Sequence, residues 1–256
     1  MKIAVTGKGG VGKTTLSAML ASVLGLKGQN VIAIDADPDA NLASAFGLPL
    51  ERYPVFLAEM RDLISERTGA KDAYGGYFKL NPKVDDIPDE YSRRVGNVRL
   101  LALGGVKGGG AGCICPASAL IKALLTHVTL ASDDALIMDM DAGIEHLGRA
   151  TTQSMDALLV VVDEGPWSAQ TALRVRTLAE DIGTKNLAAV VNRVNEHTDL
   201  EAIEASLQGI PIVGTVPYDG RLARGIIRDA DERHMTPTEV LTELLPSLER
   251  ILKHLQ

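Results

Sequence analysis

A glycine-rich segment with two lysines and two threonines lies near the start of the chain. It follows an apolar run, Lys2–Thr6, that predicts a strand, and it leads into a helical pattern over Lys13–Lys27. Glycines allow consecutive backbone N–H groups to curl around an anion, and the following helix adds the positive end of its dipole. The segment consists of Gly7, Lys8, Gly9, Gly10, Val11, Gly12, Lys13, Thr14 and Thr15. It therefore predicts a loop that binds phosphate groups.

The spacing of this loop matches the P-loop, in which two glycines with four residues between them precede a lysine and a threonine. In that arrangement the backbone binds the phosphates, and the lysine side chain reaches the β- and γ-phosphates. We therefore expect Lys13 to contact these phosphates and the Thr14 hydroxyl to bind Mg²⁺. The sequence predicts a site for a nucleoside triphosphate with Mg²⁺.

Acidic residues follow two further apolar runs. Asp37 comes shortly after one run, and Asp139 ends another. Open α/β sheets bind ligands at the carboxyl ends of their strands, so we expect both carboxylates beside the phosphate loop. Asp139 is expected to hold Mg²⁺ through water. The sequence leaves the roles of the neighbouring Asp35 and Asp39 open.

Lys8 adds a second lysine, which an ordinary P-loop lacks. The segment Lys8–Thr15 resembles the deviant Walker A ATPases, which include the nitrogenase iron protein and the septum-positioning ATPase MinD. The resemblance implies that Lys8 crosses a dimer interface and neutralises the phosphoryl group bound by the other subunit. It also implies that Asp37 positions the attacking water and belongs to the Mg²⁺ site with Thr14 and Asp139.

Later residues resemble the second switch region and the base site of the same family. The resemblance implies that Gly143 senses the γ-phosphate, while Asp141 stands where many relatives have proline and has no assigned role. It further implies that the ends of the last two strands frame the purine, with the asparagine amide bonding its edge: Asn192, Arg193, Pro217, Tyr218 and Asp219. The GTPase pattern Asn-Lys-x-Asp is absent from the sequence, so we expect adenine. The family resemblance predicts slow, Mg²⁺-dependent hydrolysis of ATP to ADP by a homodimer that forms on ATP binding, with Lys8, Lys13 and Asp37 as catalytic residues.

Two cysteines, Cys113 and Cys115, are separated by one residue and precede a helical pattern that begins near Pro116. Two such thiols do not form a disulfide framework, so they are buried apolar residues, redox thiols or metal ligands. One Cys-x-Cys pair supplies two ligands, whereas a symmetric dimer supplies four at its two-fold axis. Four thiolates suit Zn²⁺ or Ni²⁺. The structural alternative is that two small residues simply pack in a glycine-rich turn.

The Cys-x-Cys pair resembles that of the CO dehydrogenase maturation ATPases of the CooC type, which help to insert nickel into that enzyme's cluster. The resemblance implies an intersubunit nickel or zinc site, with CO dehydrogenase or an enzyme of the acetyl-CoA synthase type as client. Two alternatives stay open: an iron–sulfur electron-transfer ATPase like the nitrogenase iron protein, and a MinD-like spatial organiser. The C-terminal pattern Pro237–Leu255 is amphipathic but mixes charges, which favours packing on the sheet over membrane binding.

Short β-branched runs alternate with helical patterns along the chain, which predicts βαβ units and a parallel sheet. We expect an α/β, three-layer P-loop NTPase fold with a mostly parallel sheet of about seven or eight strands. It would form a single domain over residues 1–256, with an insertion at about residues 51–97. The predicted strands are Lys2–Thr6, Asn30–Ile34, Val98–Leu103, Ala135–Asp139, Ala157–Val162, Leu187–Asn192 and Pro211–Val216. The predicted helices are Lys13–Lys27, Phe56–Arg67, Ala117–Leu130, Ser168–Ile182, Gly220–Asp231 and Pro237–Leu255.

The overall composition limits the classes of partner. The formal net charge is −7, which argues against broad binding to nucleic acid or anionic membranes. No apolar run approaches the roughly 18–20 residues that a membrane helix needs. Because the chain opens directly on a predicted strand, we expect a cytoplasmic protein that binds neither nucleic acid nor membrane.

Overall fold

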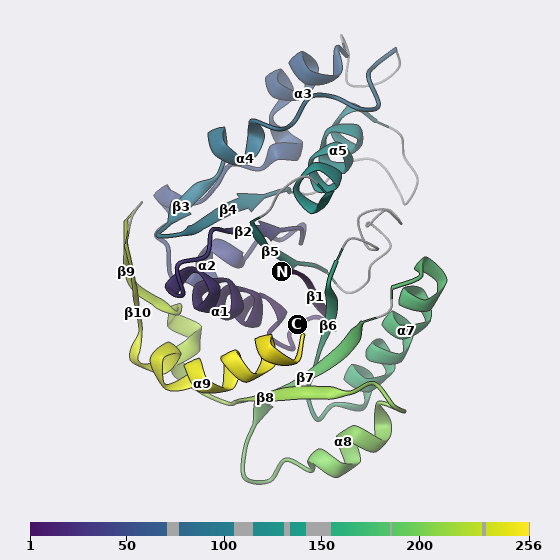
Figure 1. Cartoon of the computed structure of the whole chain (residues 1–256), viewed down its shortest axis with the longest axis vertical. Helices are drawn as coiled ribbons and strands as arrows, with labels where there is room; N and C mark the ends of the chain where they lie inside the picture. The colour runs from purple at the N-terminus through teal and green to yellow at the C-terminus, as the bar shows by residue number, and fades with distance from the viewer. Residues whose placement is uncertain are drawn as a thin grey trace.

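The computed structural model describes residues 1–70, 77–104, 115–130, 134–141, 155–184, 186–231 and 234–255. Its centre is an eight-stranded sheet in the order β3-β4-β2-β5-β1-β6-β7-β8 (Figure 1). Every pairing in this sheet is parallel except that of β3 with β4. The strands are β1 (Lys2–Gly7), β2 (Val31–Asp35), β3 (Arg93–Val95), β4 (Val98–Ala102), β5 (Ala135–Asp139), β6 (Ala157–Val162), β7 (Leu187–Val194) and β8 (Ile212–Pro217). The expected mostly parallel α/β sheet is confirmed.

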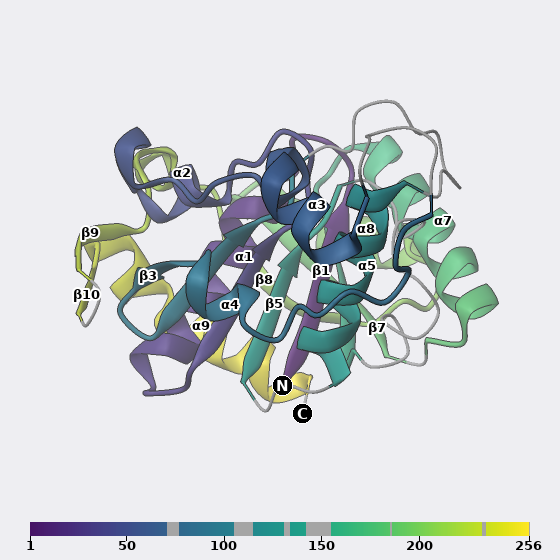
Figure 2. The same ribbon diagram turned by 90° about the horizontal axis from the view of Figure 1, so that it is seen from above.

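Helices cover both faces of the sheet, as Figures 1 and 2 show. They are α1 (Lys13–Leu26), α2 (Leu42–Phe46), α3 (Arg61–Thr68), α4 (Ile87–Glu90), α5 (Pro116–Leu130), α7 (Pro166–Ile182), α8 (Leu200–Ser206) and α9 (Glu239–His254). Side chains alternate between the two faces of a strand. In β1, Ile3 and Val5 join the core under α1 and α9, whereas Ala4 joins the core under α5 and α7. Burial on both faces explains why the central strands are almost wholly apolar.

The last helix belongs to the core of the protein. Its apolar stripe is buried and packs with α1 and β8: Val240, Leu241, Leu244, Leu248, Ile251 and Leu252. This confirms the expectation that the C-terminal helix packs on the sheet. In the described part of the chain, no helix combines the length and apolarity that crossing a bilayer requires.

Two parts of the sequence prediction differ from the structure. Within residues 51–97, the expected helix Phe56–Arg67 is a 3₁₀ turn (Leu57–Glu59) followed by α3. The segment also contains α4 and the edge strand β3, which the sequence did not predict. The expected helix Gly220–Asp231 is wrong. It is instead a 3₁₀ turn, Gly220–Arg224, followed by a hairpin of β9 (Ile227–Ala230) and β10 (Met235–Pro237).

A close contact between two backbones explains why this helix stops. Gly225 has φ 89°, which a helix cannot continue, and a Cβ on it would lie 2.4 Å from the Cα of Gly47 at the end of α2. The next residue, Ile226, donates its N–H to the carbonyl of Ala45 in α2 at 3.1 Å. The chain after the turn therefore hydrogen-bonds to α2 and does not continue as a helix.

We expect Gly225→Ala to destabilise the protein by more than the cost of its positive-φ backbone conformation alone. That conformation, φ 89° and ψ 162°, is one that only glycine adopts readily, and a residue with a Cβ there costs about 1–3 kcal/mol. The added methyl group must also displace α2, because the Gly47 backbone occupies its position. Urea unfolding would measure the loss in free energy of unfolding.

Gly28→Ala is the matched control. Gly28 also has a positive φ, 82°, but beyond its chain neighbours no atom lies within 4 Å of the position that an added methyl group would take. The loss in free energy of unfolding for Gly28→Ala should therefore reflect its backbone conformation alone. Equal losses for the two variants would mean that the contact between Gly225 and Gly47 does not constrain α2.

Candidate nucleotide-binding site

A cavity of about 500 Å³ opens at the carboxyl edge of the sheet, where β1, β2, β5 and β7 end. It brings together four parts of the chain that the sequence analysis singled out. Its lining residues are Gly9, Gly10, Gly12, Lys13, Thr14, Asp37, Pro38, Asp39, Asn41, Asp141 and Arg193. The cavity is large enough for a nucleotide, and its lining combines backbone N–H groups, a lysine, a hydroxyl and carboxylates.

The phosphate loop connects β1 to α1 as predicted. Gly12 precedes the first helical residue and has φ 95°, a conformation that favours glycine. Because Gly12 has no side chain to cap the helix, the first N–H groups of α1 stay open to an anion. Lys13 is buried at 6% exposure, Thr14 and Thr15 are half-buried, and the Val11 side chain is in the core. The loop presents its backbone and Lys13 to the cavity.

Lys8 lies apart from the lining of this cavity. It is exposed on the loop between Gly7 and Gly9, and the cavity of its own chain is lined by Lys13 instead. The action of Lys8 on another subunit stays a prediction.

Two buried carboxyl groups lie side by side below the cavity. Asp35 and Asp139 are in register at the ends of β2 and β5, and they are 2% and 0% exposed. Burial raises the pKa of Asp35 to about 7, and the negative charge of Asp139 adds to this effect. Burial also raises the pKa of Asp139 to about 6, although the hydroxyls of Thr14 and Ser17 and the charge of Lys13 act in the opposite direction.

The surroundings of Asp139 fit a cation. Its Oδ1 accepts a hydrogen bond from the Ser17 hydroxyl at 3.1 Å, whereas its buried Oδ2 has no hydrogen-bond partner among the described residues. A buried carboxylate oxygen without a partner is costly, and a divalent cation with its water would satisfy it. Oxygen ligands from a carboxylate and the nearby Thr14 hydroxyl are those that Mg²⁺ prefers.

The loop that carries Asp37 is tied at both ends to Asp35. The Asp37 N–H donates to Asp35 Oδ1 at 3.2 Å, and the Leu42 N–H donates to Asp35 Oδ2 at 2.7 Å. Asp37 Oδ1 in turn accepts from the Asp39 N–H at 3.0 Å. The sequence left the role of Asp35 open. In the structure, Asp35 sets the position of the loop that faces the cavity.

Asp141 lies at the cavity and not on a distant surface. It follows β5, its carbonyl accepts the Thr6 hydroxyl at 3.0 Å, and the residue lines the cavity. Gly143, the predicted γ-phosphate sensor, lies outside the described residues. Asp141, to which the sequence assigned no role, is thus an exposed residue at the rim of the cavity.

The predicted base site divides into two groups of residues. Arg193 lines the cavity, and Asn192 donates its amide to the carbonyl of Val11 in the phosphate loop at 2.7 Å. By contrast, Pro217, Tyr218 and Asp219 are not among the residues that line this cavity. Their contact with a purine stays a prediction.

Asp219 has a structural partner of its own. Its carboxylate accepts from the N–H and the side chain of Arg221, which also pairs with Glu243 on α9. The hydrogen bonds from Arg221 hold the pKa of Asp219 below its usual range. These interactions fix the 3₁₀ turn that follows β8.

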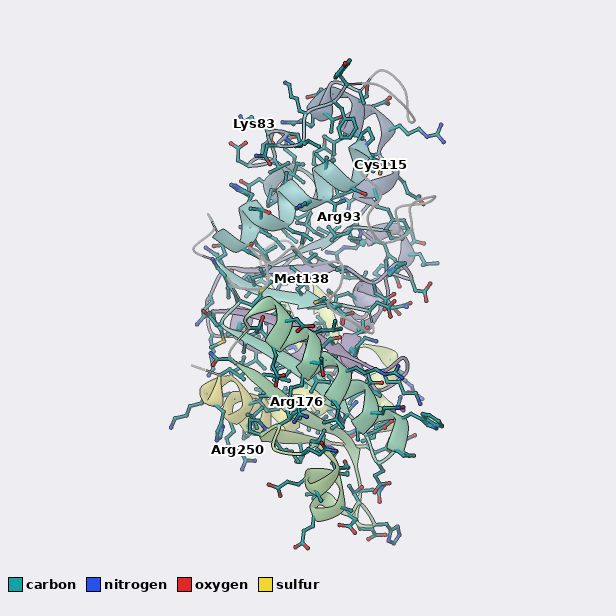
Figure 3. All side chains as sticks on the ribbon, turned by 90° about the vertical axis from the view of Figure 1, so that its right-hand side faces the viewer. Lys83, Arg93, Cys115, Met138, Arg176 and Arg250 are labelled. Atoms are coloured by element: carbon teal, nitrogen blue, oxygen red, sulfur yellow. The ribbon has the colours of Figure 1, made fainter. Side chains whose placement is uncertain are left out.

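Cys115 immediately precedes α5 and is labelled in Figure 3. Its half-buried sulfur accepts the Ser118 N–H at 3.5 Å and lies 3.2 Å from the Ser118 hydroxyl. Since α5 follows the parallel strand β4, its N-terminal end lies at the same edge of the sheet as the phosphate loop. Cys113 lies outside the described residues.

The family model for the CobQ/CobB/MinD/ParA nucleotide binding domain matches residues 2–231. The chain belongs to this family. This CobQ/CobB/MinD/ParA protein is 47% identical over 223 residues to an uncharacterised ATP-binding protein of Methanocaldococcus jannaschii, with 86% of each chain covered. It is 44% identical over 224 residues to the carbon monoxide dehydrogenase accessory protein CooC of Rhodospirillum rubrum, covering 87% of this chain and 85% of that protein.

Solved structures share the fold of this CobQ/CobB/MinD/ParA protein. A chain of the MinC:MinD cell division protein complex of Aquifex aeolicus superposes with a TM-score of 0.66 at 21% identity, covering 99% of this chain and 94% of that one. The predicted resemblance to the deviant Walker A ATPases and the prediction of an ATPase are confirmed. The roles of the individual site residues stay predictions.

We expect Asp35→Asn to lower kcat for ATP hydrolysis by about 10-fold with little change in KM. Replacing one carboxylate oxygen by an amide leaves the Asp37 or the Leu42 N–H without an acceptor, which costs about 1–3 kcal/mol in a buried site. The loop then loses the position from which Asp37 would act on the attacking water, while the phosphate loop is unchanged. Steady-state kinetics would separate the two effects.

Asp163→Asn is the matched control for this variant. Asp163 follows β6, and its carboxylate accepts the Gly165 N–H at 3.1 Å in a similar turn. It should keep the wild-type kcat. A wild-type kcat in Asp35→Asn would show that the tie to Asp35 does not position the catalytic loop.

Proposed function

We propose that this protein is a dimeric, ATP-dependent metallochaperone that binds nickel through Cys113 and Cys115 and delivers it to CO dehydrogenase. The observation that carries the proposal is the place of Cys115 at the head of α5, at the same edge of the sheet as the phosphate loop. The 44% identity to the accessory protein CooC of Rhodospirillum rubrum supports the client. Nucleotide state and metal binding can then be coupled at one edge of the molecule.

The nucleotide site supplies the chemistry for ATP hydrolysis. Lys13 and the N–H groups of the loop bind the phosphates, and the loop tied to Asp35 presents Asp37 to the attacking water. Thr14 and Asp139 would hold Mg²⁺, which neutralises charge on the phosphates when bound. The exposed Lys8 would complete the site of the other subunit, so ATP favours the closed dimer.

Closure of the dimer would bring four thiols together. Each chain contributes Cys113 and Cys115, and four thiolates form a closed site for Ni²⁺ or Zn²⁺. If ATP and the metal both favour the closed dimer, each must raise the affinity for the other. Hydrolysis then separates the subunits and releases the metal to the client. CO dehydrogenase, or a nickel enzyme of the acetyl-CoA synthase type, would receive it.

Metal binding should depend on both nucleotide and thiols. With a non-hydrolysable ATP analogue we expect one Ni²⁺ or Zn²⁺ per two chains and a doubled molecular mass. Cys113→Ser/Cys115→Ser should lose the metal, because hydroxyl oxygens are poor ligands for these soft sites. Metal analysis combined with light scattering measures both quantities in one sample.

Two further variants separate the steps. Lys8→Ala should bind the analogue but remain monomeric and bind little metal, because it lacks the group that completes the other site. Ser118→Ala keeps both thiols and loses only the hydroxyl beside Cys115, so it should bind metal as the wild type does. Undiminished metal binding in the double cysteine variant would assign the thiols a structural role and refute delivery through them.

A further inference from the structure

We propose that Asn192 is a positioning residue for the phosphate loop, in addition to any contact with the purine. Its Nδ2 donates a hydrogen bond of 2.7 Å to the carbonyl oxygen of Val11, which lies 181 residues away in the sequence. The bond joins the end of β7 to the middle of the loop. The predicted base site and the phosphate site thus share one side chain.

The loop is shaped to receive this amide. A Cβ on Gly12 would lie 2.2 Å from Asn192 Nδ2, so the amide packs directly on the Gly12 backbone. On the other side, the Val11 side chain is 1% exposed and belongs to the core with Val5. The Val11 residue is therefore fixed twice, through its side chain by the core and through its carbonyl by Asn192.

Fixing this carbonyl also fixes a donor for phosphate. The peptide bond between Val11 and Gly12 is planar and trans, so its C=O and N–H groups point in opposite directions. With the Val11 carbonyl directed at Asn192, the Gly12 N–H is directed away from Asn192. Gly12 lines the cavity, where such an N–H is available to a phosphate oxygen. Asn192 therefore orients the loop for its anion.

An irregularity in β7 places Asn192 for this task. The buried run of β7 ends at Val191, and the pairing of β7 with β8 shifts register between Asn192 and Val194. Arg193, inside the shift, has φ 60°, which is uncommon for a residue with a side chain. Consecutive residues thereby serve one site, since Asn192 holds the loop and Arg193 lines the cavity.

The side-chain amide of Asn192 can hydrogen-bond a second partner. It carries two N–H donors and an oxygen with two lone pairs, and the bond to Val11 uses one donor. The remaining donor and the oxygen match the hydrogen-bonding edge of a purine. A bound base would then stiffen the same side chain that orients the loop, which couples base recognition to phosphate binding.

The test is the ATPase activity of Asn192→Ala in the full chain, with inorganic tripolyphosphate as a competitive inhibitor. If Asn192 orients the loop, kcat at saturating Mg-ATP falls and the inhibition constant for tripolyphosphate rises, each by about 3- to 10-fold, as for loss of one hydrogen bond. Tripolyphosphate has no base, so its binding reports on the loop alone. Loss of uniform base binding would instead raise KM at constant kcat.

Asn186→Ala is the matched control. Asn186 lies before the amino end of β7, and its Nδ2 donates to the Asp156 carbonyl at 2.8 Å, a bond of the same type far from the cavity. It should keep the wild-type kcat and inhibition constant. Asn192→Leu serves as a second variant, because leucine has the shape of asparagine without its donor and should reproduce the losses of the alanine variant.

Either of two results would overturn the proposal. A raised KM with unchanged kcat and unchanged tripolyphosphate inhibition would restrict Asn192 to the base. Wild-type kcat, KM and inhibition constant would show that Asn192 contributes neither to the phosphate loop nor to base binding. The measurement concerns ATP hydrolysis, so it is independent of the metal and of the client in the proposed function.

Discussion

Two buried carboxyl groups at the centre of the sheet govern the organisation of this protein. Asp35 and Asp139 end neighbouring parallel strands in register, and both are withdrawn from water. Such a pair is unfavourable unless other groups compensate it, because burial and mutual repulsion both penalise ionisation. The chain compensates it with the Leu42 N–H, with the Ser17 hydroxyl and with the charge of Lys13.

This compensation explains why the elements of the site converge. Helix α1 brings Lys13 and Ser17 to Asp139, while the loop before α2 wraps around Asp35. The same elements line the cavity, and Lys13 both lowers the cost of ionising Asp139 and faces the cavity. Among the described residues, the one buried carboxylate oxygen without a hydrogen-bond partner belongs to Asp139. The site is thus electrostatically incomplete in a way that a cation and a polyphosphate together would complete.

The sequence predicted the parts of the fold and of the site that depend on short stretches of chain. The loop Gly7–Thr15 and the buried strands carry local patterns, because phosphate binding and burial on both faces each constrain consecutive residues. The helix expected over Gly220–Asp231 was wrong because its end depends on Gly47, which is distant in the sequence. The tie from Asn192 to Val11 escaped prediction for the same reason. Contacts between distant backbones leave no periodic signal.

The contact of Ile226 with α2 extends the influence of the buried acids to the far end of the chain. Asp35 binds the Leu42 N–H at the start of α2, and Ala45 of the same helix accepts the Ile226 N–H. Ile226 in turn accepts from both the N–H and the hydroxyl of Thr238, the residue that caps α9. Hydrogen bonds through α2 therefore connect the carboxyl edge of the sheet to the C-terminal helix. Since Gly47 and Gly225 leave no side chain between the two backbones, we expect a shift of α2 to move the turn before β9 with it.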